Sequence, residues 1–327
     1  MVQSVKLTNF ISDEERPGGR VRVDCLHEIH FQDAVNIKKM RENTVDLVIT
    51  SPPYWSIKDY GREEQLGFND TLNEYMRKLR EIFGACIRAL KPNSKLCINI
   101  GDQFLRASTP PKKVYQIIPL HAMLINNLLT AFGDDIVYLG TIYWNKVTRS
   151  KTSGGGQIMG SYPFPKSGYF FINREFIALF RKLGRVKPKD KPDPILKQAS
   201  RMTLPEWREF FKDTWKIPPA PQDTHMAMFP EAIPLRLIKM YSIVGNTILD
   251  PFTGSGTTNR MAGLLGRSSI GYEIGFETKD GTPWKKLLKK KIEVENQQIP
   301  FTIEEGRGKK KTRHEALLDV RNSYSYP

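Results

Sequence analysis

The sequence predicts an α/β fold built on one doubly wound, mostly parallel sheet. Three observations lead to this prediction. Strand-like and helix-like segments alternate along the first half of the chain, a β-branched strand at 45–49 stops at the pair Pro52-Pro53, and a strand at 248–250 is followed by a Gly-x-Gly turn and a helix. Alternation of this kind is typical of sheets covered by helices on both faces, and such sheets bind ligands beyond the carboxyl ends of their strands.

Composition sets the class of protein and the kind of partner. The 327 residues can bury a sizeable core, and 39% hydrophobic and 26% charged residues are ordinary for a soluble globular protein. No apolar run approaches the ~20 residues that span a bilayer, and the N-terminus lacks the apolar segment of a signal peptide. We therefore expect a cytoplasmic protein without a membrane partner. The net charge of +15, from 50 Lys+Arg and 35 Asp+Glu, favours a polyanionic partner.

Cysteine and histidine usage predicts neither disulfides nor a metal. The three cysteines, Cys25, Cys86 and Cys97, are few, odd in number and far apart. His27 and His30 form one close pair, but no acidic or thiol side chains flank them at the spacing of a metal site. We expect no metal.

The N-terminal part predicts a strand–helix–strand unit. Residues 1–20 are expected to form a polar lead-in that ends in a Pro-Gly-Gly turn. Residues 20–25 alternate as a short strand, a helix follows over 27–41, and the next strand leads to Ser51. In this interpretation Asp24 and Ser51 lie at the same carboxyl edge of the sheet.

Further elements follow by the same signals of periodicity and capping. They are a helix over 72–90, a strand over 95–102, a helix from about 117 to 132, a strand over 136–144, a strand over 176–180, a helix over 229–241, a strand over 248–250, a helix through Leu265 and a strand over 268–273. A basic helix or tail is expected at 285–291.

The middle of the chain differs in character. Residues 146–170 are basic, rich in glycine and aromatic residues, and without periodicity, which favours a binding loop. Residues 181–197 are basic and contain prolines, with Trp207 and Trp215 close behind. This pattern fits a solvated linker, and equally an electrostatic patch with stacking side chains.

The strand before Ser51 ends in a stiff loop. Pro52 lacks the backbone donor that a ladder requires, and each proline fixes its own φ and disfavours helix in the residue before it. The loop therefore presents a hydroxyl, free carbonyls and the rings of Tyr54 and Trp55. Taken alone, a Pro-Pro pair most often marks an ordinary strand-ending turn.

The loop after the strand at 248–250 has the features of a nucleoside site. Gly254 and Gly256 allow backbone positions that a side chain would block, and Glu273 ends the next strand about 20 residues later. No Gly-Lys-Ser/Thr follows, so the loop is not a Walker loop. The third glycine of a dinucleotide fingerprint is also absent, which favours a mononucleoside-type cofactor over NAD.

These two loops together carry a resemblance to a known family. Thr-Ser-Pro-Pro-Tyr-Trp at 50–55 with Asp-Pro-Phe-Thr-Gly-Ser-Gly-Thr-Thr at 250–258 resembles the amino-group DNA methyltransferases that use S-adenosylmethionine. The order of the loops is that of their permuted β group, and the resemblance covers roughly residues 20–275. It implies a circularly permuted, Rossmann-like class I methyltransferase fold with an inserted DNA-recognition region. It also implies duplex DNA as partner and a prokaryotic restriction-modification system as context.

The resemblance further implies a division of the chain and a set of site residues. We expect a catalytic half at 1–145, a target-recognition region at 146–215, a cofactor-binding half at 216–300 and a tail at 301–327. The catalytic residues are then Ser51, Pro52, Pro53 and Tyr54. The cofactor-binding residues are Asp24, Cys25, Phe229, Pro230, Asp250, Pro251, Phe252, Gly254, Ser255, Gly256, Thr257, Thr258 and Glu273. The residues at the target base or DNA are Trp55, Trp144, Lys146, Arg149 and Lys151.

The chemistry of amine methylation agrees with these residues. The amine's lone pair is delocalised into the base, and two acceptors, Ser51 Oγ and the Pro52 carbonyl, could hold its protons and direct that lone pair at the methyl group. Tyr54 could stack on the base, which must be flipped out of the duplex. No covalent intermediate is needed, which is consistent with the absence of a Pro-Cys nucleophile.

Serine at the first position of the loop is common among cytosine-N4 enzymes. We therefore predict cytosine-N4 methylation, with adenine-N6 methylation as the alternative. A DNA-binding protein that has lost catalysis and an RNA or small-molecule methyltransferase are further alternatives. The sequence leaves open the recognition sequence, whether the protein is a monomer or a homodimer, and whether a restriction endonuclease accompanies it.

Overall fold

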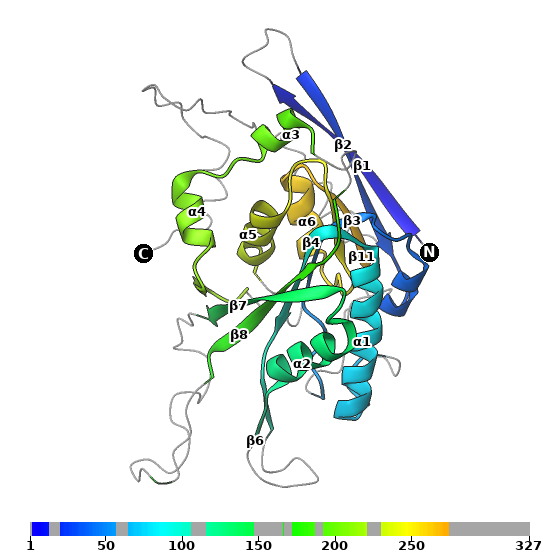
Figure 1. Cartoon of the computed structure of the whole chain (residues 1–327), viewed down its shortest axis with the longest axis vertical. Helices are drawn as coiled ribbons and strands as arrows, with labels where there is room; N and C mark the ends of the chain where they lie inside the picture. Colours follow the sequence, from blue (N-terminus) through cyan, green and yellow to red (C-terminus); the bar gives the residue numbers. More distant parts are fainter. Residues whose placement is uncertain are drawn as a thin grey trace.

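The computed structural model describes residues 2–12, 20–56, 65–105, 116–146, 166, 172–186, 192–220 and 230–274. Its centre is a nine-stranded sheet in the order β1-β2-β11-β10-β3-β4-β8-β7-β9 (Figure 1). The strands of this sheet are β1 Val2–Ser12, β2 Arg20–His30, β3 Val45–Thr50, β4 Leu90–Ile100, β7 Ile136–Lys146, β8 Arg174–Lys182, β9 Thr214–Ile217, β10 Thr247–Asp250 and β11 Ser268–Tyr272. A separate two-stranded sheet pairs β5 Gln103–Leu105 with β6 Gln116–Ile118.

The middle of the sheet is parallel. Strands β2, β11, β10, β3 and β4 all run in one direction, while β8 and β7 continue the sheet as antiparallel neighbours and β9 pairs parallel with β7. This is the predicted doubly wound, mostly parallel α/β fold. Strand β3, which leads to Ser51, lies between β4 and β10.

Helices cover both faces of the sheet and enclose two cores (Figure 1). On one face, α1 and α2 pack over alternate residues of β3 and β4, including Val48 and Leu96; on the other, α5 and α6 pack over the intervening residues, including Leu47 and Cys97. Successive strand residues point to opposite faces, so each strand contributes to both cores. The helices are α1 Leu72–Ala89, α2 Leu120–Phe132, α3 Pro194–Ala199, α4 Leu204–Phe210, α5 Ala232–Tyr241 and α6 Thr257–Leu264, with a 3₁₀ helix, η1, at Ala34–Lys39.

The N-terminal prediction needs two corrections. Residues 2–12 are strand β1, antiparallel to β2, where we expected a polar lead-in. The expected short strand and helix at 20–41 are instead one long strand, β2, which reaches His30, followed by η1. The reason is visible from Val23 to Ile29, where alternate side chains are buried, a period of two that belongs to a strand.

The region predicted for target recognition, 146–215, is partly built into the sheet. All of β8 and the first residues of β9 fall inside it, and α3 and α4 lie between them. The expected basic segment at 285–291 and the tail at 301–327 lie outside the described residues.

Over the part of the chain that the structure describes, no helix is long and apolar enough to cross a membrane. The same residues contain no group of three or more side chains suited to hold a metal ion. All three cysteines are buried and unbridged, and burial raises the pKa of the Cys86 and Cys97 thiols.

Candidate active site

The Ser-Pro-Pro-Tyr loop, residues 50–56, begins where β3 ends, beside the end of β10. Thr50 Oγ1 donates a hydrogen bond of 2.7 Å to Asp250 Oδ1, and the Phe252 amide donates to the same oxygen at 3.0 Å. Thr50 and Asp250 are both buried. The two loops singled out in the sequence therefore meet at one sheet edge, joined directly by this bond.

Asp250 is a buried acid. Its burial raises the pKa of the carboxyl from an ordinary value of 3.8 to about 6, and the hydrogen bonds from Thr50 and Phe252 act in the opposite direction by stabilising the charged form. Removing either donor would therefore raise the pKa further.

Helix α1 holds the other end of the Ser-Pro-Pro-Tyr loop. The Tyr75 hydroxyl donates to the Pro53 carbonyl at 2.8 Å, and Trp55 Nε1 donates to the Asp70 carbonyl at 2.8 Å. Tyr75 is fully buried. The loop is thus fastened at its prolines and again at Trp55.

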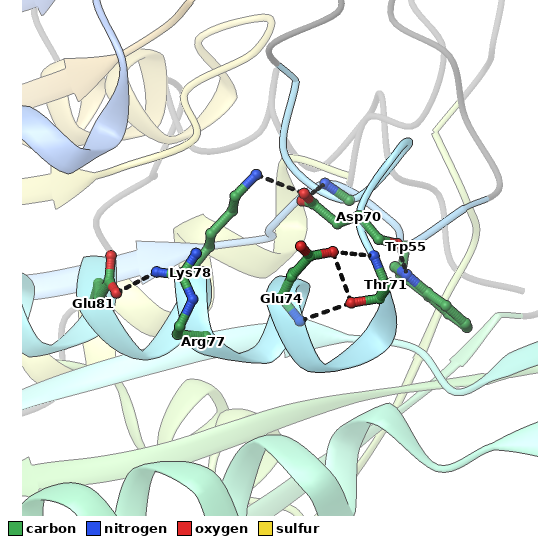
Figure 2. Close-up of polar contacts among 8 residues, drawn as sticks. Trp55, Asp70, Thr71, Glu74, Arg77, Lys78 and Glu81 are labelled. Carbon is green, nitrogen blue, oxygen red and sulfur yellow. Dashed lines mark hydrogen bonds and ion pairs between the residues drawn. The ribbon is translucent and has the colours of Figure 1, made fainter.

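The N-terminus of α1 is itself strongly capped, as Figure 2 shows. Thr71 and Glu74 form a capping box, in which each side chain accepts a hydrogen bond from the other residue's backbone amide. Asp70 pairs with Lys78 at 2.6 Å and accepts from the Gly67 amide at 2.8 Å. The anchor for Trp55 is therefore a fixed helix end.

A row of polar side chains crosses the sheet beside Ser51. Asn99 Nδ2 lies 3.3 Å from Ser51 Oγ and donates to Glu175 Oε2 at 2.6 Å. The Tyr54 hydroxyl donates to Glu175 Oε1 at 2.5 Å, and Lys146 Nζ forms an ion pair with that oxygen. Glu175 is 3% exposed, so the structure brings three predicted residues, Ser51, Tyr54 and Lys146, around one buried carboxylate.

The Gly-Ser-Gly loop, residues 251–256, turns between β10 and α6. Gly254 and Gly256 have φ of 50° and 77°, in the left-handed region that favours glycine. The Thr253 amide donates to the Tyr272 carbonyl at 2.9 Å, and a Cβ added at Gly271 would lie 2.1 Å from Thr253 Oγ1. Strand β11 therefore fits closely under this loop only because residue 271 is a glycine.

Glu273 lies beside the same loop. Its Oε2 accepts from the Gly254 amide at 2.9 Å, and its own amide donates to the His30 carbonyl at 3.0 Å. A left-handed glycine turn and an acid that follows the neighbouring strand are the elements of a nucleoside-binding edge, so these residues fit a mononucleoside-type cofactor.

The remaining predicted residues of this loop support it from within. Pro251, Ser255, Thr257 and Thr258 are buried, and Ser255 Oγ lies 3.0 Å from Thr257 Oγ1. Phe252 packs edge-on against Phe83 of the α1 core.

Pro230 is also buried, and its carbonyl accepts the Ile233 amide at the start of α5. The next residue, Glu231, forms an ion pair with Arg260 of α6, which ties the start of α5 to the helix that follows the Gly-Ser-Gly loop.

The placement predicted for Asp24 and Cys25 at this edge is wrong. Because β2 continues to His30, Asp24 lies in mid-strand, exposed, and Cys25 is buried toward the opposite edge, before the pairing of His27 with Ser269 at the start of β11. The acid that follows β2 at the carboxyl edge is Asp33, which caps η1 by accepting from the Val35 amide at 2.8 Å. In the sequence, Asp33 could have been identified as the N-cap of a short helix. The prediction missed it because it ended the strand at residue 25 instead of residue 30.

Trp144, which was predicted to lie at the target base or DNA, is a core residue in the structure. Trp144 is 2% exposed, lies in the α5/α6 core and donates to the Ile217 carbonyl at 2.8 Å. Trp215 is fully buried as well, so it does not belong to a stacking surface. Of the expected stacking side chains, Trp207 is exposed and stacks on Phe211.

Three predicted residues, Phe229, Arg149 and Lys151, lie outside the described residues. Two residues that the sequence did not single out, Asn99 and Glu175, form the polar row beside Ser51. Asn99 lies two residues after Cys97, and Glu175 lies two residues before Ile177, so each points to the same face of the sheet as a buried core residue. A polar side chain at an inward-facing strand position was the only feature of the sequence that could have identified them.

Comparison with known proteins identifies the family of the chain. The family model N6_N4_Mtase, described as DNA methylase, matches residues 45–282. The chain is 32% identical over 316 residues to the Type II methyltransferase M.MjaI of Methanocaldococcus jannaschii, covering 87% of this chain and 97% of that protein. It is 30% identical over 275 residues to the Type II methyltransferase M.MthZI of Methanothermobacter thermautotrophicus, covering 78% and 74%.

Solved structures agree in fold. The putative DNA modification methylase TTHA0409 from Thermus thermophilus, complexed with S-adenosyl-L-methionine, has a TM-score of 0.63 and 25% identity and covers 82% of this chain and 94% of its own. The PvuII DNA methyltransferase (cytosine-N4-specific) has a TM-score of 0.55, covers 81% and 92%, and at 16% identity supports the fold alone. With the family match over residues 45–282 and a relative 32% identical over 87% of this chain, this chain belongs to the N6/N4 family of S-adenosylmethionine-dependent DNA methylases.

Proposed function

We propose that this protein is a cytosine-N4-specific DNA methyltransferase of the Type II restriction-modification kind. It transfers a methyl group from S-adenosylmethionine to the exocyclic N4 of a cytosine flipped out of duplex DNA. The observation that carries the proposal is the joining of the Ser-Pro-Pro-Tyr loop to the Gly-Ser-Gly loop by the 2.7 Å bond from Thr50 to Asp250.

In this proposal each loop has a separate task. When bound, S-adenosylmethionine supplies an electrophilic methyl group on a sulfonium. The Gly-Ser-Gly loop and Glu273 hold the nucleoside part of the cofactor, with the carboxylate as acceptor for ribose hydroxyls. Ser51 Oγ and the Pro52 carbonyl accept the two amino protons of the base, so that the nitrogen lone pair is directed outward. The methyl group that the bound cofactor would supply replaces one amino proton of the base, and that proton is released to solvent.

Tyr54 and the recognition residues act on the DNA. The Tyr54 ring stacks on the flipped base. Lys146 lies at the end of β7, and we propose that it contacts the DNA together with Arg149 and Lys151. Trp55 is held by Asp70, and we assign it to supporting the loop at the target base.

The choice of base rests on Ser51. A neutral serine in the first position of the Ser-Pro-Pro-Tyr sequence favours methylation of cytosine N4 over adenine N6. Adenine-N6 methylation is the second candidate, because both amines need the same two hydrogen-bond acceptors. Similarity to Type II methyltransferases supports DNA as the substrate over RNA.

The test is incubation of the purified protein with labelled S-adenosylmethionine and duplex DNA carrying its site, followed by hydrolysis and separation of the methylated nucleosides. We expect N4-methyldeoxycytidine. N6-methyldeoxyadenosine would establish the second candidate, and label only in RNA, or cofactor binding without transfer, would contradict the proposal.

A further inference from the structure

We propose that Glu175, on β8, is a positioning residue for methyl transfer, which holds the Tyr54 phenol directly and the Ser51 hydroxyl through Asn99. The inference rests on the proposed function and deepens it, because it names what keeps the two loop residues in place. The observation behind it is that one buried carboxylate binds side chains from the loop after β3, from β4 and from β7.

Glu175 is buried, and its surroundings suit only an acceptor. A carboxylate at 3% exposure is costly unless it is paired and hydrogen-bonded. Here Tyr54 and Lys146 donate to Oε1, and Asn99 donates to Oε2. Three donors on two oxygens can be satisfied by a carboxylate and not by an amide, which would turn an N–H toward one of them.

The charge of Glu175 also decides which way the Asn99 amide faces. An asparagine amide can be turned either way, but a carboxylate accepts only, so the NH₂ group must face Glu175. The same Nδ2 lies 3.3 Å from Ser51 Oγ, where it occupies one lone pair and leaves the other for the target amine. Asn99 Oδ1 is buried and, within the described part of the chain, has no hydrogen-bond partner, so no other contact fixes this orientation.

The sheet leaves space for this arrangement at Gly101. A Cβ added at residue 101 would lie 3.1 Å from Glu175 Cγ and 3.7 Å from Tyr54 Cε1. The absence of a side chain there lets the Tyr54 ring approach the carboxylate, so the contact depends on the residue that follows β4 as well as on the loop.

The experiment compares full-length wild-type protein with Glu175→Gln, in single-turnover methyl transfer to duplex DNA and in equilibrium binding of S-adenosylmethionine. The substitution keeps the shape of the side chain and removes one acceptor and the charge. We expect the transfer rate to fall by about 100-fold, the scale of a small misplacement of reacting groups, while the cofactor Kd stays within about threefold.

The matched control is Asp46→Asn, because Asp46 is also a largely buried carboxylate that pairs with a lysine, Lys91, and accepts a backbone amide, from Thr247. It lies near the start of β3, at the opposite edge from Ser51, and its loss should leave the transfer rate unchanged. An equal fall in both variants would mean a general loss of structure and would overturn the inference.

A double-mutant cycle separates positioning from mere stabilisation. If Glu175 acts through Asn99, the pair Glu175→Gln and Asn99→Ala should lose much less than the product of the two single losses, because coupled residues are not additive. Multiplicative losses, or Glu175→Gln as fast as wild type, would overturn the inference.

If Glu175→Gln does not fold, Tyr54→Phe tests the same contact from the loop side. It should slow transfer at least tenfold at an unchanged Tm, and an unchanged rate would overturn the inference. Failure of wild-type protein to methylate DNA at all would instead contradict the proposed function.

Discussion

Thr50 and Asp250 are 200 residues apart in the chain and are joined by a buried hydrogen bond of 2.7 Å. The bond runs between the last residues of two neighbouring parallel strands, β3 and β10. The buried contacts of the sheet therefore fix where the two loops lie relative to each other. The contribution of this bond to folding stability can be measured separately from the rate of methyl transfer.

Thr50→Val should lower the free energy of unfolding by about 1–3 kcal/mol, because a buried carboxylate loses one donor while the side-chain volume is kept. Urea denaturation measures this change. Thr44→Val is the control, since the Thr44 hydroxyl donates to the Arg41 carbonyl in an exposed turn, and it should cost less than about 0.5 kcal/mol. Equal costs in the two variants would contradict the importance of the Thr50 bond.

Asp250 should give folding a pH dependence of unusual sign. Its pKa is raised to about 6 in the fold, so between about pH 4 and 6 the folded state keeps a proton that the unfolded chain has lost. The stability contributed by protonated Asp250 is complete below about pH 4 and is lost as the pH rises through 6, by about 3 kcal/mol.

Burial of His27 lowers its pKa from 6.5 to about 4. As the pH falls from 6.5 to 4, the unfolded chain gains a proton on His27 that the folded protein does not, so the free energy of unfolding decreases. The two effects oppose each other in the wild type. The measurement is therefore the difference in unfolding free energy between wild type and Asp250→Asn, by urea denaturation from pH 4 to 7. We expect that difference to change across this range, and a constant difference would show that Asp250 does not titrate as described.

Ser51→Ala should slow methyl transfer by about 10²-fold or more while S-adenosylmethionine still binds, since it removes one group that acts on the reacting amine. Single-turnover transfer and equilibrium cofactor binding measure the two properties. Ser56→Ala, an exposed serine in the same loop, serves as control and should stay within twofold. Near-normal turnover of Ser51→Ala would remove Ser51 from its proposed role.

Gly271→Ala should weaken cofactor binding by at least tenfold, because the added Cβ would lie 2.1 Å from Thr253 Oγ1 and force the Gly-Ser-Gly loop to move. Titration with S-adenosylmethionine measures the loss. Adding Thr253→Ala removes the atom in conflict and should restore part of the affinity. Unaltered binding in Gly271→Ala would mean that the loop is free to shift without consequence.

Trp144→Phe distinguishes the core position of this residue from the base contact that the sequence suggested. It removes the bond to the Ile217 carbonyl and some buried volume, so we expect a loss of roughly 1–3 kcal/mol of stability and an unchanged transfer rate. Thermal unfolding and single-turnover transfer measure the two. A slower transfer at unchanged stability would support the base contact.

The sequence predicted the fold well where local signals and tertiary structure agreed. The strand at 45–50 with its two prolines, the capped helix at 72–89 and the strand–turn–helix at 247–264 appeared as expected. Each has a local cause: a donor missing from proline, a capping box, or left-handed glycines.

Prediction failed where the decisive contact lies far away in the chain. Helix-like composition hid the second half of β2, whose buried alternation is fixed by pairing with β11 some 240 residues later. Trp144 could not be assigned to the core without knowing that α5 covers that face. Glu175 was missed because its three partners come from separate segments.

The bond between Thr50 and Asp250 also bears on how such enzymes diversify. Because the two loops follow adjacent strands, the length of the connections that lie outside the sheet does not set the distance between the loops. Those connections can therefore change in length while the two loops stay in place, whereas β4 and β8, which carry Asn99 and Glu175, must be kept. A graft between two relatives would best be joined at the strand ends, so that the strands of the sheet are kept.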